Sequence, residues 1–293
     1  MRIPSNLHGI LAMVSAMGVF IAADSCIKLA LPFMPLFELS LMRGVASVVF
    51  CLILLKVMGQ LQHLRLMLNP WVTARAVLET SGNIAFTIAI LKLPLADVVA
   101  IAQICPMLVL LGAWLIWGEA LGTSRLFLIA LGITGALLVA QPGSSAASPM
   151  ALLGFFVASV AASRDLMTRK VPTNIPAPVV AFTVLVTLML SSLIGMLLFE
   201  TPVVPQWRSV GLAVLAGALI VGGHIGVFIA YKIGPARSVA PFMYTLTLWA
   251  VFFGAVLFGD IPNTLAIIGM ALILLAGLAI IVLDTRRRPV AVI

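Results

Sequence analysis

The sequence predicts an all-α polytopic membrane protein: ten transmembrane helices in two five-helix inverted-topology repeats, with the N- and C-termini cytoplasmic. Three observations lead to this fold class, namely an apolar composition, recurring apolar runs of helix length and an internal repeat. The 293 residues are 63% hydrophobic and only 9% charged, with a mean hydropathy of +1.24. A soluble domain carries roughly 25% charged residues, so this chain cannot cover a water-facing surface in the usual way.

Apolar runs of about 20 residues, the length that crosses a bilayer core as a helix, recur along the chain. Proline and glycine mark the breaks between them, for example at Pro32, Pro142-Gly143 and Gly234-Pro235. Helices are the expected form because lipid offers no partner to unpaired backbone groups. The predicted spans are residues 7–31, 35–58, 71–91, 95–117, 124–141, 150–171, 176–199, 208–231, 237–259 and 264–283.

Lys and Arg fall mostly on one side of these spans. The other side receives only Lys28, Lys92 and Arg208. Because positive residues favour the cytoplasmic side, this asymmetry places both termini inside, in a multi-pass protein of the cytoplasmic (inner) membrane. The net charge of +8 is scattered between apolar runs, so no nucleic-acid partner is expected. The residues assigned to the inner side are Arg2, Lys56, Arg65, Arg75, Arg125, Arg169, Lys170, Lys232, Arg237, Arg286, Arg287 and Arg288.

The second half of the chain repeats the first after about 141 residues, the offset between Asp24 and Asp165. The same shift aligns Gly118-Glu119 with Gly259-Asp260. Because each copy has five helices, the second copy must enter the membrane from the opposite side. Inverted repeats are common in secondary transporters, whose site lies near the midplane between the halves. We therefore divide the chain into a first repeat at 7–141, a second repeat at 150–283 and a cytoplasmic basic tail at 284–293.

Motifs for enzymatic chemistry are absent from the sequence, which has no Walker loop, zinc-ligand spacing or GxSxG. Cys26, Cys51 and Cys105 lie inside apolar segments without metal-ligand spacing. We therefore expect no catalytic residues, no metal and no cofactor. Without a nucleotide-binding loop, any uphill transport must draw on a gradient of an ion or solute, such as a proton or a counter-solute.

Several segments resemble the EamA type of the drug/metabolite transporter superfamily. The run from Cys105 to Glu119 resembles the fourth helix of that family, and Arg75 to Pro94 resembles the third. Phe37-Glu38 followed by Arg43 is similar to its second helix. Residues 240–244 with 258–260 resemble the ninth helix of the S-adenosylmethionine-transporter-like branch. Here the chain departs from the common pattern of the family, because Asp260 replaces the usual Glu and the proline of this helix, Pro241, comes early in it.

This resemblance implies a basket of helices 1–4 and 6–9 around a central cavity, with helices 5 and 10 at the periphery. It also implies transport of small organic metabolites across the inner membrane without ATP. The motifs identify the family but say little about the substrate.

Charged residues at membrane depth are candidates for the site, because a central charge costs roughly 2.5–3.5 kcal/mol and needs a partner or water. Asp24 and Asp165, related by the repeat, would act in a proton relay or bind cationic groups. Alternatively, they form ion pairs with Lys28 and Arg169, four residues later. Arg164 would face the cavity or bind a lipid phosphate.

The third span offers Glu79 and Asn83, one turn apart, as groups that would hold a polar substrate. The alternative is that Arg75 neutralises Glu79 while Asn83 bonds a neighbouring helix. His224, among glycines of the eighth span, would titrate during transport or bond across a helix contact as a neutral imidazole. Arg43 needs a counter-charge from Glu38, Asp24 or Glu79, and the resemblance favours a structural clamp over direct ligand contact.

Two prolines within spans, Pro106 and Pro241, lie close to Gln103 and Tyr244. Proline removes a helix hydrogen bond, so the freed carbonyls would serve binding or gating, or the helices are simply kinked. The predicted substrate-binding residues are Asp24, Glu79, Asn83, Gln103, Asp165, His224 and Tyr244, with Arg43 and Arg164 as charge partners and Pro106 and Pro241 as kink or gating residues.

The sequence thus predicts a secondary transporter of a small organic metabolite, amino-acid-like or S-adenosylmethionine-like, that works by alternating access. The alternatives are a membrane-embedded small-molecule receptor or a lipid-handling protein without active transport. A membrane-embedded enzyme should gather catalytic groups at one membrane face, and the sequence contains no such group. Membrane lipids are expected neighbours, and a homodimer is compatible with the sequence.

Overall fold

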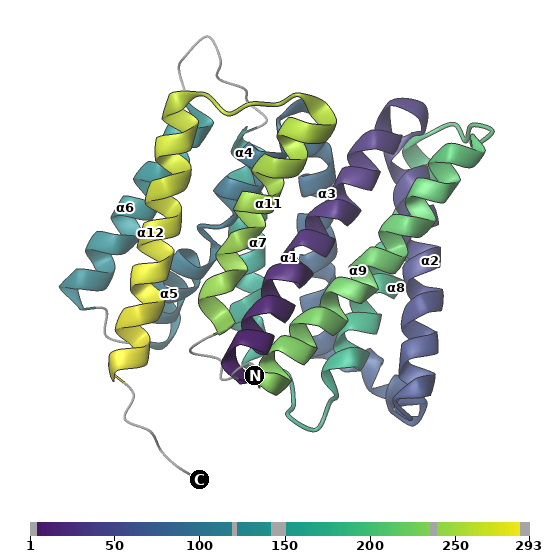
Figure 1. Cartoon of the computed structure of the whole chain (residues 1–293). Helices are drawn as coiled ribbons and strands as arrows, with labels where there is room; N and C mark the ends of the chain where they lie inside the picture. The colour runs from purple at the N-terminus through teal and green to yellow at the C-terminus, as the bar shows by residue number, and fades with distance from the viewer. Residues whose placement is uncertain (1–4, 119–121, 142–150, 235–238, 288–293) are drawn as a thin grey trace.

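A computed structural model describes residues 5–118, 122–141, 151–234 and 239–287, and every regular element in these ranges is helical (Figure 1). The elements are α1 (Ser5–Ala30), η1 (Leu31–Phe33), α2 (Leu36–Val57), η2 (Leu61–Leu68), α3 (Pro70–Lys92), α4 (Leu95–Ala102), α5 (Cys105–Trp117), α6 (Thr123–Ala140), α7 (Ala151–Thr168), α8 (Ala177–Phe199), α9 (Trp207–Ile233), η3 (Ala240–Tyr244), α11 (Thr245–Phe253), η4 (Gly254–Phe258) and α12 (Thr264–Arg287).

Seven of the helical stretches are long and apolar enough to cross a membrane. α3 and α7 are not among them, and each carries an acid and a base that lower its apolar character: Glu79 with Arg75, and Asp165 with Arg164. The apolar stretch at Phe242–Phe258 is shorter. The prediction of an all-helical polytopic membrane protein is confirmed, while the number of ten spans and their orientation stay predictions.

Most predicted boundaries lie within a few residues of the observed ones, but two predicted spans are interrupted. The span expected at 95–117 consists of α4 and α5, separated by a turn at Gln103 and Ile104. Pro106 lies in the first turn of α5, where its missing N–H costs no helix bond. The span expected at 237–259 is likewise divided into η3, which has Pro241 in its first turn, α11 and the π-helical η4.

Helix ends are fixed by specific residues. The Asn69 side chain accepts a hydrogen bond from the backbone N–H of Trp71 (3.0 Å) at the start of α3. The Glu200 carboxylate accepts bonds from the backbone N–H groups of Phe37 (2.9 Å) and Glu38 (3.0 Å), where the helix dipole of α2 favours negative charge. Corresponding glycines in the two halves, Gly118 (φ +67°) and Gly259 (φ +69°), end α5 and η4 in the left-handed conformation.

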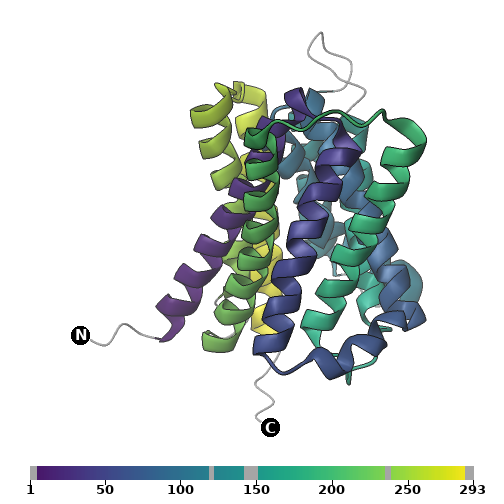
Figure 2. The same cartoon turned by 90° about the vertical axis from the view of Figure 1, so that its right-hand side faces the viewer.

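The long helices pack side by side, and each long pair joins the two halves of the chain (Figures 1 and 2). α1 packs on α9, α3 on α7, α2 on α8, and α6 on α12. The α6–α12 pair lies at one edge of the bundle and the α2–α8 pair at the other. The first turns of α1 and the last turns of α12 lie at the same end of the bundle, the lower end in Figure 1.

A lysine joins three segments at the opposite end of the bundle. The Lys28 ammonium forms an ion pair with Asp260 (3.0 Å) and donates to the carbonyl of Leu93 (3.2 Å). It also lies 4.5 Å from the centre of the Phe258 ring. Lys28 therefore pairs with an acid of the other half, rather than with Asp24 on its own helix.

The α6–α12 contact depends on small residues. A Cβ atom placed on Gly269 would lie 2.5 Å from the carbonyl oxygen of Gly135. We predict that Gly269→Leu lowers the free energy of unfolding by about 1–3 kcal/mol, because the added side chain forces the helices apart. The measurement is thermal unfolding of the purified protein in detergent. Gly222→Leu is the control, since the nearest atom there is 4.0 Å away; equal effects of the two changes would contradict the prediction.

Candidate functional site

A cavity of about 700 Å³ lies between α2, α3, α8 and α9, and its wall is mostly aliphatic. It reaches the end of the bundle where α1 begins, because Met58 after α2 and Pro172 after α7 belong to its lining. Its volume and apolar character suit a small organic molecule. The polar side chains of the lining are Arg43, Ser47, Arg75, Glu79, Thr80, Asn83, Thr168 and His224.

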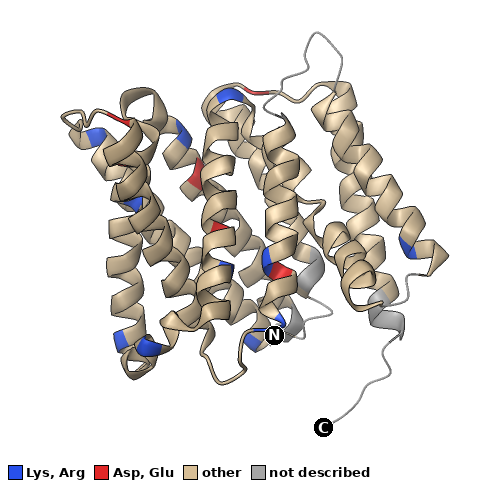
Figure 3. Cartoon of the chain, turned by 180° about the vertical axis from the view of Figure 1, so that it is seen from behind, with Lys and Arg blue, Asp and Glu red and all other residues tan. Residues whose placement is uncertain are grey.

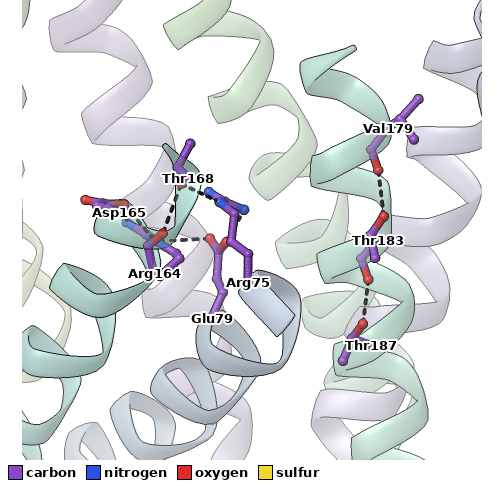
Figure 4. Close-up of polar contacts among 8 residues, drawn as sticks. All are labelled: Arg75, Glu79, Arg164, Asp165, Thr168, Val179, Thr183 and Thr187. Atoms are coloured by element: carbon purple, nitrogen blue, oxygen red, sulfur yellow. Dashed lines mark hydrogen bonds and ion pairs between the residues drawn. The ribbon is translucent and has the colours of Figure 1, made fainter. Parts of the chain in front are cut away.

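Four charged residues of α3 and α7 form a cluster (Figure 4), and two of them, Arg75 and Glu79, line the cavity. The Glu79 carboxylate accepts from Arg75 (2.9 Å) on its own helix and from Arg164 (3.0 Å) on α7. Arg164 also pairs with the neighbouring Asp165 (2.8 Å). Figure 3 shows that charged residues lie part-way along helices as well as at their ends. The two arginines and two acids of this cluster neutralise one another.

The cluster also bonds α3 to α7 through a neutral group. Arg75 donates to the Thr168 hydroxyl (2.9 Å), which itself donates to the carbonyl of Arg164 (3.0 Å). On the far side of the cluster, the Cys105 thiol lies 3.7 Å from an oxygen of Asp165. The ion pair of Arg75 with Glu79, which the sequence offered as an alternative to substrate binding, is therefore present. Glu79 also has a second partner, Arg164, from the other half of the chain.

Arg43 and Asn83 lie at the end of the cavity farthest from Met58. Arg43 is only 3% exposed and donates to the side-chain oxygen of Asn83. Asp24 interacts electrostatically with Arg43, but no ion pair within 4 Å joins these two described side chains. The other candidate counter-charges are used elsewhere, because Glu79 belongs to the α3–α7 cluster and Glu38 accepts from the backbone of Val203 (3.1 Å).

His224 lines the opposite wall, on α9. Its Nδ1 lies 2.8 Å from the carbonyl of Ile220, one turn earlier. Its ring meets that of Phe20 on α1 edge-on, at 5.1 Å between centres. A neutral imidazole that donates from Nδ1 keeps Nε2 as an acceptor, so His224 can offer a hydrogen-bond acceptor to a molecule in the cavity.

The predicted site residues divide into two groups. Glu79, Asn83 and His224 line the cavity together with Arg43, whereas a second group lies outside the lining and its predicted roles are untested. In this second group, Gln103 donates to the carbonyl of Met243 (3.4 Å) between the two interrupted spans. The residues outside the lining are Asp24, Gln103, Asp165, Tyr244, Arg164 and Pro106, and the side chain of Pro241 is outside the part of the chain that the structure describes.

Tyr244 and Asp165 lie outside the cavity because their side chains contact other parts of the bundle. The Tyr244 side chain is 5% exposed and packs on α12, where a Cβ on Gly277 would meet its hydroxyl at 2.1 Å. Asp165 faces Arg164 and Cys105 rather than the cavity. Sequence reasoning missed Ser47, Thr80 and Thr168, although Thr80 stands one helical turn before Asn83 and could have been found from that spacing.

Metal binding has no support in the part of the chain that the structure describes. No group of three His, Cys, Asp or Glu side chains there is arranged to hold a metal ion. The side chains of the cavity lining can supply hydrogen bonds, charge pairing and apolar contact.

Comparisons with known proteins agree on one family. The EamA-like transporter family matches residues 7–141. A riboflavin transporter of Rhizobium johnstonii is 31% identical over 74% of this chain and 72% of its own length. A pseudopaline exporter of Pseudomonas aeruginosa is 25% identical over 93% of this chain and 95% of its own. A riboflavin transporter of Vibrio cholerae is 24% identical over 96% and 95%.

A solved crystal structure has a similar fold. It superimposes with a TM-score of 0.60 over 98% of this chain and 99% of the other, at 20% identity. At that identity the likeness concerns the fold alone.

The ion pairs of Glu79 should contribute to the stability of the protein. Glu79→Gln leaves Arg75 and Arg164 without their shared carboxylate, so we expect a loss of up to about 3 kcal/mol in the free energy of unfolding. Adding Arg75→Gln should restore part of it, because Glu79 is the one carboxylate among the described side chains that contacts Arg75, so the double change removes an unpaired charge. A double-mutant cycle in detergent measures the coupling, expected at about 0.5–3 kcal/mol. Strictly additive effects would contradict the shared pairing; Lys92→Gln, at an exposed position, is the control.

Proposed function

This chain belongs to the EamA-like transporter family, and on that premise we propose that it is a secondary transporter of a small organic metabolite. The transport would proceed across the cytoplasmic membrane by alternating access between two halves. The observation that carries the proposal is the cavity between α2, α3, α8 and α9, in which charged groups inside the bundle face an aliphatic wall. Intramembrane charges of this kind typically mark substrate pathways.

The pattern of helix contacts supports two inverted repeats. If the halves 7–141 and 150–283 are exchanged, the α1–α9 contact becomes the α7–α3 contact. The α2–α8 and α6–α12 contacts map onto themselves. This is the pattern expected of a pseudo-two-fold axis between five-helix units, and it supports ten spans if the interrupted stretches and the polar helices α3 and α7 are counted as crossing.

The position of the cavity supports an inward-facing state. Its lining continues to Met58 and Pro172, at the end of the bundle where α1 begins. The distribution of Lys and Arg predicts that this end is cytoplasmic. The opposite end is held by Lys28 with Asp260 and Leu93. We therefore propose that the cavity opens to the cytoplasm in this conformation.

The substrate class is proposed from the relatives and the cavity together. Relatives named for riboflavin and for pseudopaline transport favour an organic metabolite. We keep the amino-acid-like or S-adenosylmethionine-like solute as our proposal, with a proton or counter-solute gradient as the energy source. Membership of the S-adenosylmethionine-transporter-like branch is supported only by the resemblance at 240–244 and Asp260.

Blocking the cavity tests the transport proposal. Ala181 lines the cavity on α8, and Ala181→Trp should abolish transport because the indole occupies the substrate volume. Uptake of radiolabelled riboflavin, and of a mixture of radiolabelled amino acids, is measured in proteoliposomes with and without a proton gradient. Leu190→Trp on the same helix is the control, since Leu190 is 49% exposed and outside the lining.

Three results of this assay would count against the proposal: no uptake by the wild-type protein, full uptake by Ala181→Trp, or equal losses in both tryptophan variants. The thermal unfolding midpoint of each variant must stay close to that of the wild type, so that a loss of uptake reflects the cavity rather than misfolding.

Orientation can be tested with single cysteines. In a background without Cys26, Cys51 and Cys105, we predict that Arg208→Cys reacts with a membrane-impermeant maleimide in intact cells, because it lies on the predicted outer side. Lys56→Cys should react only after permeabilisation. Both side chains are exposed, so access depends on the side of the membrane. The reverse labelling pattern would overturn the proposed topology.

A further inference from the structure

We propose that the deep end of the cavity is a carboxylate subsite formed by Arg43, Thr80 and Asn83, and that the substrate is an organic acid with an apolar body. This inference rests on the proposed transport function and narrows its substrate class. The three residues belong to α2 and α3, and all of them line the cavity.

Arg43 supplies the positive charge of the subsite. It is 3% exposed, yet its hydrogen bond within the described structure goes to a neutral amide, that of Asn83. The other two arginines near the cavity, Arg75 and Arg164, both contact the Glu79 carboxylate directly. Asp24 acts on Arg43 only at longer range and does not line the cavity. A guanidinium offers planar paired donors that match a carboxylate, so Arg43 is the arginine with capacity for one.

Asn83 is oriented by this contact. Because its side-chain oxygen accepts from Arg43, its NH₂ group is directed away from the guanidinium and is available as a donor. The described residues provide no acceptor for that NH₂ group. A carboxylate bound beside Arg43 would therefore receive bonds from both side chains, one from each helix.

Thr80 differs from the other buried threonines of these helices. Thr87 on α3 and Thr183 on α8 donate to the backbone carbonyl four residues earlier, at 2.9 Å in each case. The Thr80 side chain is 3% exposed, and its hydroxyl has no partner among the described atoms. Leaving a buried hydroxyl unpaired is unfavourable, and a bound carboxylate would satisfy it after rotation about the Cα–Cβ bond.

The rest of the lining indicates what the acid group is attached to. Val184 and Leu188 of α8, with Ile220 and Ile225 of α9, present an aliphatic wall across from the subsite. Glu79 is the acid of the described lining, and it already receives two arginines. A cationic ligand group would thus find no free carboxylate, whereas a carboxylate finds Arg43.

The test compares an acid with its amide. Purified protein in detergent is titrated with N-acetyl-L-tryptophan and with N-acetyl-L-tryptophanamide, and the apparent dissociation constants come from the shift of the thermal unfolding midpoint. We expect the wild type to bind the acid roughly tenfold more tightly than the amide, as hydrogen bonds to a charged group allow. Arg43→Lys and Thr80→Val should each reduce this ratio, mainly by weakening binding of the acid.

Thr183→Val is the matched control, because it makes the same change at a buried threonine whose hydroxyl bonds Val179, and both residues lie outside the lining; it should keep the wild-type ratio. Equal binding of acid and amide by the wild type would overturn the subsite. The subsite would also be overturned if both variants kept the wild-type preference for the acid, or if Arg43→Lys weakened the binding of acid and amide equally. Uptake in proteoliposomes separates the two proposals. If the protein binds the acid more tightly than the amide but transports no solute, the proposed subsite stands and the proposed transport function is wrong.

Discussion

The requirement that partly buried charges be neutralised explains how α3 and α7 meet. The Glu79 carboxylate lies between two guanidiniums, one from its own helix and one from the other half of the chain. In a low-dielectric interior any one of these charges alone would be costly. The α3–α7 contact therefore satisfies an electrostatic need that apolar packing could not, and it makes one wall of the cavity polar.

Elsewhere the two halves meet through close packing of small residues. Gly223 and Gly226 of α9 approach Phe20 and Ala16 of α1, where a Cβ would lie 2.7–2.8 Å from a side-chain atom. The α1–α9 contact thus corresponds to the α3–α7 contact in position but differs from it in chemistry. The α1–α9 contact is tightly packed, whereas the α3–α7 contact is ionic and borders the cavity.

Much of the fold could be predicted from the sequence, because proline, glycine and apolar length determine where helices begin and end. The limits of α2, α6 and α8 follow from those signals within a residue or two. The ion pair of Arg75 with Glu79 was also predictable, since it is local along one helix. The break at Gln103 was not, because Pro106 marks the interruption without specifying a turn three residues earlier.

Some residues of the cavity lining could be predicted from the sequence, but their partners on distant segments could not. Arg164 reaches Glu79, and Lys28 reaches Asp260, across contacts between distant segments that spacing along the chain cannot reveal. Asp24 and Asp165 lie at equivalent repeat positions, yet neither lines the cavity. The aliphatic wall from α8 and α9 carries no distinctive residue type, so composition could not separate it from lipid-facing surface.

The three contacts of Lys28 share a single ammonium group. One nitrogen holds a carboxylate and a backbone carbonyl and lies over an aromatic ring, in segments far apart in the sequence. Movement of α1 away from the other two segments at this end would therefore break an ion pair, a hydrogen bond and a ring contact together.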